Sequence, residues 1–340
     1  MDRQYNQNAD VQRGQGAALL DSVRKCSSAF GKTESLLVAD FGCGPGGNSV
    51  APLQAVAAGA ASSAVASVHV LMVDSQADPD LWKQLDNKIE ELSNSAEVIV
   101  TWTNIQHSFY VPLSEPFMGC VDLAWSAVAA HWLSELPTSC PDFIVGNQLD
   151  AGDVQSAWTA RAKEDWAHWL RLRALELRSG GRLVVAMPGR DASGDFVARG
   201  AWNVFTDIKK SLVRDGLLSD ENAARLATRE YWRSEDEVFE PLRAPDSMLE
   251  VESFWIEHRP CPFVGAKMRG ALDAQECADK LIGAFQGFLS TEFNAALGEV
   301  ATMFWDTARG AAVDRAKDMD LHVIMHHLVL RRKRTATRHL

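Results

Sequence analysis

Long apolar runs are absent from this 340-residue sequence, in which no stretch approaches the roughly 18 apolar residues that a membrane-spanning helix needs. Residues 1–14 are polar and charged, whereas a secretory signal would have an apolar stretch there. Apolar residues still make up 46% of the chain and charged residues 23%, which is typical of globular proteins and excludes a disordered chain. We therefore expect a folded cytoplasmic protein with no membrane partner.

Positive charge is also scarce, because 34 Lys and Arg residues stand against 45 Asp and Glu residues and the formal net charge is −11. Such a chain repels the polyphosphate backbone of a nucleic acid. The basic residues at 331–334 are more typical of a solvated chain end than of an import signal. We expect no nucleic-acid partner, and the net charge favours a small monoacid over a polyanionic substrate.

Cysteine is sparse, with six residues and no C-x-x-C pair, which excludes a disulfide scaffold and favours reduced thiols. One pair of histidines, His322 and His326, has a metal-ligand spacing of four. Val323 follows the first histidine, however, at the position of the glutamate of a zinc protease. We assign no metal.

Strands and helices alternate along the first part of the chain. The apolar pattern predicts a helix around 19–23, further helices at 81–92 and 155–178, and buried strands at 36–40, 68–74, 98–101, 121–125 and 183–187. Gly180 and Gly181 are expected to end the third helix. This order predicts an α/β fold with a doubly wound, Rossmann-like and mostly parallel sheet, whose ligands bind at the carboxyl ends of the strands.

The later part of the chain is mainly helical and rich in aromatic residues, with extended segments at 251–257 and 321–330. We therefore expect a cofactor-binding core at 1–194 and a mainly helical cap at 195–319 that is interleaved with a strand near 251–257. The last strand and a basic tail follow at 320–340.

A glycine-rich turn with the sequence D-F-G-C-G-P-G-G-N follows the first strand. Glycine permits the sharp turn and lets a ligand approach the backbone without a Cβ in the way. Gly42, Gly44 and Gly47 satisfy the G-x-G-x-x-G spacing, so a nicotinamide oxidoreductase is one alternative. Pro45 removes a backbone N–H from that loop, however, and the charge of Asp40 disfavours a phosphate.

An acidic residue beside a D-x-G-x-G turn suits a cationic ligand that has no phosphate. S-adenosylmethionine is such a ligand, since its amino group and its sulfonium are positive. Asp74, at the end of the second strand, is placed to accept hydrogen bonds from both ribose hydroxyls. S-adenosylmethionine is therefore the predicted cofactor.

Short segments along nearly the whole chain match one family pattern in the right order. They are Y-x-x-N-A-x-x-Q at 5–12, the loop at 39–48, SFY at 108–110, WLS at 132–134, KEDWAHWLRLRALELRSGGRLVV at 163–185 and YWRSEDEV at 231–238. Together they resemble the SABATH methyltransferases. That family transfers the methyl group of S-adenosylmethionine to small carboxylic acids and, in one branch, to purine-alkaloid nitrogens.

The resemblance implies a set of cofactor-binding residues, in which Ser108 and Phe109 frame the adenine. With Gly44 of the turn, the set is Tyr5, Asp40, Cys43, Asn48, Asp74, Ser75, Ser108 and Phe109. Because family members are commonly homodimers, it also implies a homodimer.

The resemblance further implies that Gln12 and Trp132 donate hydrogen bonds to the substrate carboxylate, with His131 in the neighbouring pocket position. Val128 stands where several plant members have a tyrosine. The expected apolar walls of the substrate pocket are Val128, Trp202, Tyr231, Leu281 and Ala284.

Methyl transfer to a carboxylate needs no general base, because the carboxylate is already ionised at neutral pH. The protein must align one carboxylate oxygen with the methyl carbon, and neutral donors such as Gln12 and Trp132 can do so without neutralising the nucleophile. We expect O-methylation of a small, mainly apolar carboxylic acid. The alternatives are N-methylation of a small heterocycle and a catalytically silent relative that binds the cofactor.

Overall fold

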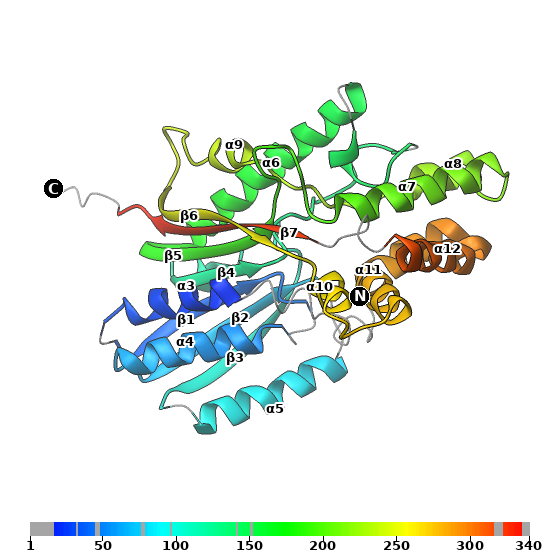
Figure 1. The fold of residues 1–340 in the computed structure, drawn as a ribbon. Helices are drawn as coiled ribbons and strands as arrows, with labels where there is room; N and C mark the ends of the chain where they lie inside the picture. The colour runs from blue at the N-terminus through cyan, green and yellow to red at the C-terminus, as the bar shows by residue number, and fades with distance from the viewer. Residues whose placement is uncertain are drawn as a thin grey trace.

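The computed structural model describes residues 17–31, 33–44, 48–75, 79–95, 97–140, 142–149, 152–315 and 322–334. Within them lies a seven-stranded sheet of order β3-β2-β1-β4-β5-β7-β6 (Figure 1). Five strands are parallel: β1 (Ser35–Phe41), β2 (Ser67–Asp74), β3 (Ile99–Gln106), β4 (Val121–Ala127) and β5 (Leu177–Pro188). The strands β7 (Val323–Arg332) and β6 (Leu249–Arg259) pair antiparallel, β7 with β5 and β6 with β7.

Helices cover both faces of the sheet (Figure 1). One face carries α3 (Ala17–Ser28), α4 (Val50–Ser62) and α5 (Pro79–Ser95), and the other carries α6 (Asp153–Glu176) and α9 (Glu235–Phe239). The central strands are almost continuously buried because they are covered on both sides. The predicted doubly wound α/β fold is therefore confirmed. Short 3-10 helices lie at Glu115–Phe117 (η1), Gly146–Gln148 (η2) and Gly298–Val300 (η3).

A second group of helices gathers beyond one end of the sheet, on the right in Figure 1. It comprises α7 (Arg199–Arg214), α8 (Asp220–Arg225), α10 (Pro262–Met268), α11 (Ala274–Leu297) and α12 (Ala301–Asp314). Phe205 of α7 lies at its centre, with ring centroids 4.9 Å from Phe285 of α11 and 5.8 Å from Phe304 of α12. These aromatic side chains belong to the same buried cluster as Val38 and Trp125 of the sheet, so the two parts share a core.

The two glycines expected to end α6 lie inside β5 instead. The helix ends at Glu176, and Leu177 already begins the strand. Gly180 has φ +79°, and a Cβ on Gly181 would lie 2.9 Å from the carbonyl oxygen of Val121, where the β4–β5 register shifts. The glycines are thus required by a β-bulge between two strands, which the local sequence pattern does not reveal.

Other boundaries also differ from the expected ones. The strand predicted at 98–101 extends to Gln106 as edge strand β3, and the alanine-rich stretch after Val50 forms the buried helix α4. The extended segments predicted at 251–257 and 321–330 are confirmed as β6 and β7, and they complete the same sheet. Among the helices that the structure describes, none is both long and apolar enough to cross a membrane.

Candidate active site

A cavity of about 460 Å³ opens at the carboxyl ends of the parallel strands, where doubly wound proteins bind their ligands. Its walls come from the segments that follow β1, β2, β3 and β4, from α3 and α4, and from α11. Eight predicted cofactor residues line it, namely Asp40, Cys43, Gly44, Asn48, Asp74, Ser75, Ser108 and Phe109. Two further predicted residues, Tyr5 and Gln12, lie outside the described residues.

The turn after β1 has a backbone that only glycine adopts easily. Gly42 has φ +81° and Gly44 has φ +55°, both in the left-handed region. A Cβ on Gly42 would also lie 2.3 Å from the Cβ of Ala129, so no side chain fits there. The turn is tied to β2 because the N–H of Gly44 donates to Oδ2 of Asp74 at 2.8 Å.

The carboxyl group of Asp40 is 3% exposed at the end of β1. Burial raises its pKa to about 7, an effect that a hydrogen bond with Ser49 reduces and the nearby carboxylate of Asp74 reinforces. A cationic group bound beside Asp40 would favour its ionised form. Cys43 is buried as well, and burial raises the pKa of its thiol well above the usual value, so this cysteine is a neutral lining group.

A buried ion pair of α6 contacts the loop that follows β3. Nη1 of Arg173 donates to the carbonyl oxygen of Phe109 at 2.8 Å, and its guanidinium lies 3.6 Å from the centre of the Phe41 ring. Nε and Nη2 of Arg173 donate to Glu176 at 2.6 and 2.7 Å. Glu176 also accepts from the N–H of Leu113 at 2.9 Å. One ion pair therefore fixes two points, Phe109 and Leu113, of the loop that follows β3.

The facing wall follows β4 and begins with a strained residue. Val128 has φ +57°, which is rare for a β-branched side chain, and its N–H donates to the carbonyl of Ala186 at 2.7 Å. The predicted wall residue Val128 lines the cavity together with Ala127, Ala129, Trp132, Leu133 and Ser134. This wall is completed by Phe288, Thr291 and Glu292 of α11.

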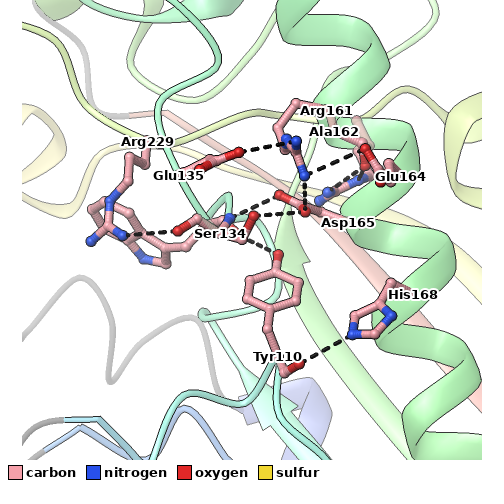
Figure 2. Close-up of polar contacts among 11 residues, drawn as sticks. Tyr110, Ser134, Glu135, Arg161, Ala162, Glu164, Asp165, His168 and Arg229 are labelled. Carbon is pink, nitrogen blue, oxygen red and sulfur yellow. Dashed lines mark hydrogen bonds and ion pairs between the residues drawn. The ribbon is translucent and has the colours of Figure 1, made fainter.

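Polar contacts hold the Trp132–Ser134 part of this wall in place (Figure 2). The hydroxyl of Tyr110 donates to the carbonyl of Trp132 at 2.6 Å. The N–H and the hydroxyl of Ser134 both donate to the buried carboxylate of Asp165, each at 2.8 Å. Arg161 in turn contacts Asp165 at 3.4 Å, so the wall is anchored to α6.

The indole ring of Trp132 faces Phe288 edge-on, with centroids 6.3 Å apart, and packs against His131 at 5.5 Å. Among the described residues its Nε1 has no acceptor, so this N–H can serve a ligand. His131 does not line the cavity: it is 2% exposed, behind Trp132, and its Nε2 lies 3.2 Å from Oε1 of Glu230.

The chain matches the model of the S-adenosylmethionine-dependent carboxyl methyltransferases over residues 2–333. It belongs to this family. The chain is 31% identical over 146 residues to the salicylate/benzoate carboxyl methyltransferase of Arabidopsis thaliana, and this match covers 40% of this chain and 38% of that protein. It is 26% identical over 205 residues to indole-3-acetate O-methyltransferase 1 of Oryza sativa subsp. japonica, with 55% and 50% covered. The matches thus span half or less of these relatives.

The fold of the chain is similar to a solved structure of loganic acid methyltransferase with S-adenosylhomocysteine. The TM-score is 0.77 at 18% identity, with 99% of this chain and 98% of that chain covered. The family match confirms both the sequence resemblance and the predicted cofactor, S-adenosylmethionine. The glycine cradle and the two buried carboxyl groups, Asp40 and Asp74, fit a cationic cofactor of this kind.

Four residues predicted as substrate-pocket walls do not line the cavity, and this corrects the sequence-based expectation. Trp202 packs between Trp232 and Phe285, at centroid distances of 5.6 and 5.2 Å. The hydroxyl of Tyr231 donates to Glu237 at 2.7 Å in a separate cluster. Leu281 and Ala284 are buried in the core. The aromatic cluster fills the space next to them, so the cavity meets α11 only further along, at Phe288.

The two histidines with metal-ligand spacing do not converge. Nε2 of His322 lies 2.9 Å from Asp195, whereas Nε2 of His326 lies 3.1 Å from the carbonyl of Arg190. Among the described residues there is no group of three or more His, Cys, Asp and Glu side chains that could hold a metal ion.

Several residues of the site were not predicted from the sequence. Tyr110 and Ser134 lie in the matched SFY and WLS segments, which could have indicated them. Arg173 and Glu176 are also in a matched segment, and their i, i+3 spacing on a helix is typical of an ion pair. Arg229 lines the cavity with no local signal in the sequence.

Proposed function

We propose that the protein transfers the methyl group of S-adenosylmethionine to a carboxylate oxygen of a small, mainly apolar carboxylic acid. The observation that carries this proposal is one continuous cavity, which is lined by Asp40 and Asp74 on one wall and by Trp132 on the other. A cationic methyl donor and an acid can therefore meet in one enclosure. Such positioning alone can supply about 7–11 kcal/mol of the catalysis.

The cofactor wall supplies binding and orientation. When bound, S-adenosylmethionine supplies an electrophilic methyl group on a positive sulfonium. We assign the ribose to Asp74, and the adenine to Ser108 and Phe109, whose loop Arg173 holds. We assign the methionine end of the cofactor to Asp40 and the glycine turn. There the carboxylate of Asp40 would compensate the positive charge of the cofactor.

The facing wall orients the acid. Its carboxylate is ionised at neutral pH, so a carboxylate oxygen attacks the methyl carbon in line while the carbon–sulfur bond breaks and its electron pair stays on sulfur. The products are a methyl ester and neutral S-adenosylhomocysteine, and no proton moves. The N–H of Trp132 would hold the carboxylate, with its backbone fixed by Tyr110. Gln12 remains the proposed second donor, whereas His131, which does not line the cavity, is assigned no contact with the acid.

Product identification tests this function. The purified protein is incubated with methyl-labelled S-adenosylmethionine and a panel of small aromatic and aliphatic acids and neutral heterocycles. We expect a labelled, base-labile methyl ester from at least one acid. Label on a ring nitrogen with every acid inert would instead support N-methylation of a heterocycle. One relative is named Probable 7-methylxanthine methyltransferase 2, from Theobroma cacao (27% identical over 129 residues, 34% of each chain).

A homodimer is proposed from the family resemblance alone. Light scattering at micromolar concentration should give a mass twice the 37.3 kDa of one chain. A single species with the mass of one chain would contradict it. A cytoplasmic location likewise stays a prediction from the sequence.

A further inference from the structure

Arg229 is the one cationic side chain on the described lining of the cavity, whose acidic side chains are Asp40, Asp74 and Glu292. An anionic substrate therefore meets a wall that is mainly acidic and a single compensating cation. Arginine suits that role because its planar guanidinium binds a carboxylate through two parallel N–H donors. The placement of Arg229 gives the cavity a cationic anion-binding position, in addition to the neutral N–H donor of Trp132.

The guanidinium of Arg229 is held loosely. Nη2 lies 3.4 Å from Oε1 of Glu292, and Nη1 lies 3.4 Å from the carbonyl oxygen of Ser134. The side chains of Arg229 and Glu292 are 41% and 46% exposed, so this ion pair is solvated and weak. Ser134 is different, because two hydrogen bonds to Asp165 anchor it (Figure 2). The Ser134 carbonyl can therefore orient Arg229 while Glu292 is exchanged for another carboxylate.

The position of Arg229 also indicates which substrate group it reaches. It contacts the segment after β4 and α11, whereas the proposed cofactor residues follow β1, β2 and β3. A group held by Arg229 thus lies across the cavity from the cofactor. Apolar side chains, including Val128, Leu133 and Phe288, also line the cavity. The cavity suits a molecule with an apolar middle and an anionic group at each end.

We propose that Arg229 is a specificity-determining residue that binds the distal carboxylate of a small dicarboxylic acid, of which the other carboxylate is methylated. This inference rests on the proposed carboxyl methyltransferase function and narrows its substrate class. The distal carboxylate takes the place of Glu292, whose side chain is exposed enough to turn into water. The product is a monomethyl ester, and the distal group is unchanged. The net charge of −11 repels a dianion at long range, but salt screens this repulsion beyond about 8 Å.

Matched substrates test this proposal. Linear dicarboxylic acids of increasing length are compared with the half-amide and the monocarboxylic acid of the same length, and kcat/KM is measured for each. We expect the wild-type protein to prefer the diacid over its half-amide. Arg229→Gln should lower that preference by about tenfold to a hundredfold, mainly through KM, because a hydrogen-bonded charge pair is lost. Arg229→Lys should restore part of it.

Control variants separate this effect from general damage. Glu292→Gln removes the competing carboxylate and should keep or raise the preference for the diacid. Arg225→Gln removes an exposed arginine that pairs with Glu221 at 2.6 Å on α8, and it should leave the preference unchanged. The affinity of Arg229→Gln for S-adenosylhomocysteine, measured by calorimetry, reports whether that variant is folded.

Three results would overturn the inference. The wild-type protein could methylate the half-amide as well as the diacid, or Arg229→Gln could keep the preference. In the third, Arg229→Gln would lower kcat/KM equally for diacids and monoacids, which would place the reacting carboxylate on Arg229. The proposed function fails separately, and this inference with it, if wild-type protein that binds S-adenosylhomocysteine methylates no acid.

Discussion

At the scale of single residues, Asp40 combines a structural cost with a proposed role in cofactor binding. The ordinary pKa of an aspartate carboxyl is 3.8. In the folded protein burial disfavours the charge of Asp40 and raises its pKa to about 7. Between these two pH values the folded state binds the proton more tightly than the unfolded state. Stability therefore falls as pH rises from about 4 to 7, and the full cost persists above pH 7.

Replacing Asp40 by Asn should stabilise the protein and weaken cofactor binding. At pH 8 the variant has no buried charge, so we expect a higher Tm than wild type, and the difference should shrink as pH falls towards 5. Each kcal/mol gained corresponds to roughly 2–4 °C in a chain of this size or somewhat smaller. Calorimetric titration should show weaker binding of S-adenosylmethionine. A variant with a lower Tm than wild type at pH 8 would contradict the argument.

Trp132→Phe tests the proposed carboxylate donor, since it keeps most of the ring and removes the indole N–H. We expect kcat/KM for the identified acid to fall by about 10- to 150-fold, with little change in cofactor affinity. Gln12→Leu should act in the same direction. Trp255→Phe is the matched control, because Trp255 of β6 stacks on His327 of β7 and does not line the cavity. If Trp132→Phe and Gln12→Leu both kept the wild-type kcat/KM, the proposal that these two residues hold the substrate carboxylate would be refuted.

At the scale of elements, the end of α6 supports the cofactor wall. The side chains of Arg173 and Glu176 are 0% and 1% exposed. Arg173 donates to the carbonyl of Phe109, and Glu176 accepts from the N–H of Leu113. A helix can fix a loop in this way only when its buried charges are fully paired, because an unpaired buried charge is costly. The loop conformation thus depends on a helix that does not itself line the cavity.

Arg173→Met combined with Glu176→Gln removes this support without leaving a buried charge. We expect the Kd for S-adenosylmethionine to rise by about tenfold or more, with a smaller change in KM for the acid. Lys209→Met is the control: Lys209 is equally buried and donates to the carbonyls of Cys140, Phe143 and Leu226, none of which lines the cavity. Equal losses of cofactor affinity in both variants would indicate general destabilisation instead of positioning.

At the scale of the whole molecule, the helices at the end of the sheet are not an independent unit. One buried cluster runs from Val38 and Trp125 of the sheet to Phe205 and Phe304 of the helices. Apolar surface shared in this way is exposed all at once when either part unfolds. The cap expected at 195–319 therefore depends on the sheet for its stability.

Thermal unfolding should accordingly be a single transition. Far-UV circular dichroism and tryptophan fluorescence should give the same midpoint, and S-adenosylhomocysteine should shift both together by mass action. Two separated transitions would contradict the shared core. A fragment that ends near residue 194 should not give a cooperative transition, because it also lacks strands β6 and β7.

The sequence by itself determined the alternation of strands and helices and the glycine turn after the first strand, and it indicated eight residues that line the cavity. These features are local: apolar periodicity sets each element, and Gly42 and Gly44 adopt a conformation that the turn requires. Motif order along the chain was enough to indicate the family, which the match over residues 2–333 confirms.

Only the tertiary structure decided which cap residues meet the cavity. Arg229 and Glu292 are 63 residues apart in sequence, and Arg173 and Phe109 are 64 apart, so no local pattern relates them. Trp202 has the aromatic character expected of a pocket wall, but its neighbours in space bury it in the core. Whether an apolar residue lines a cavity or fills a core depends on what packs against it, and that is set by contacts between distant segments.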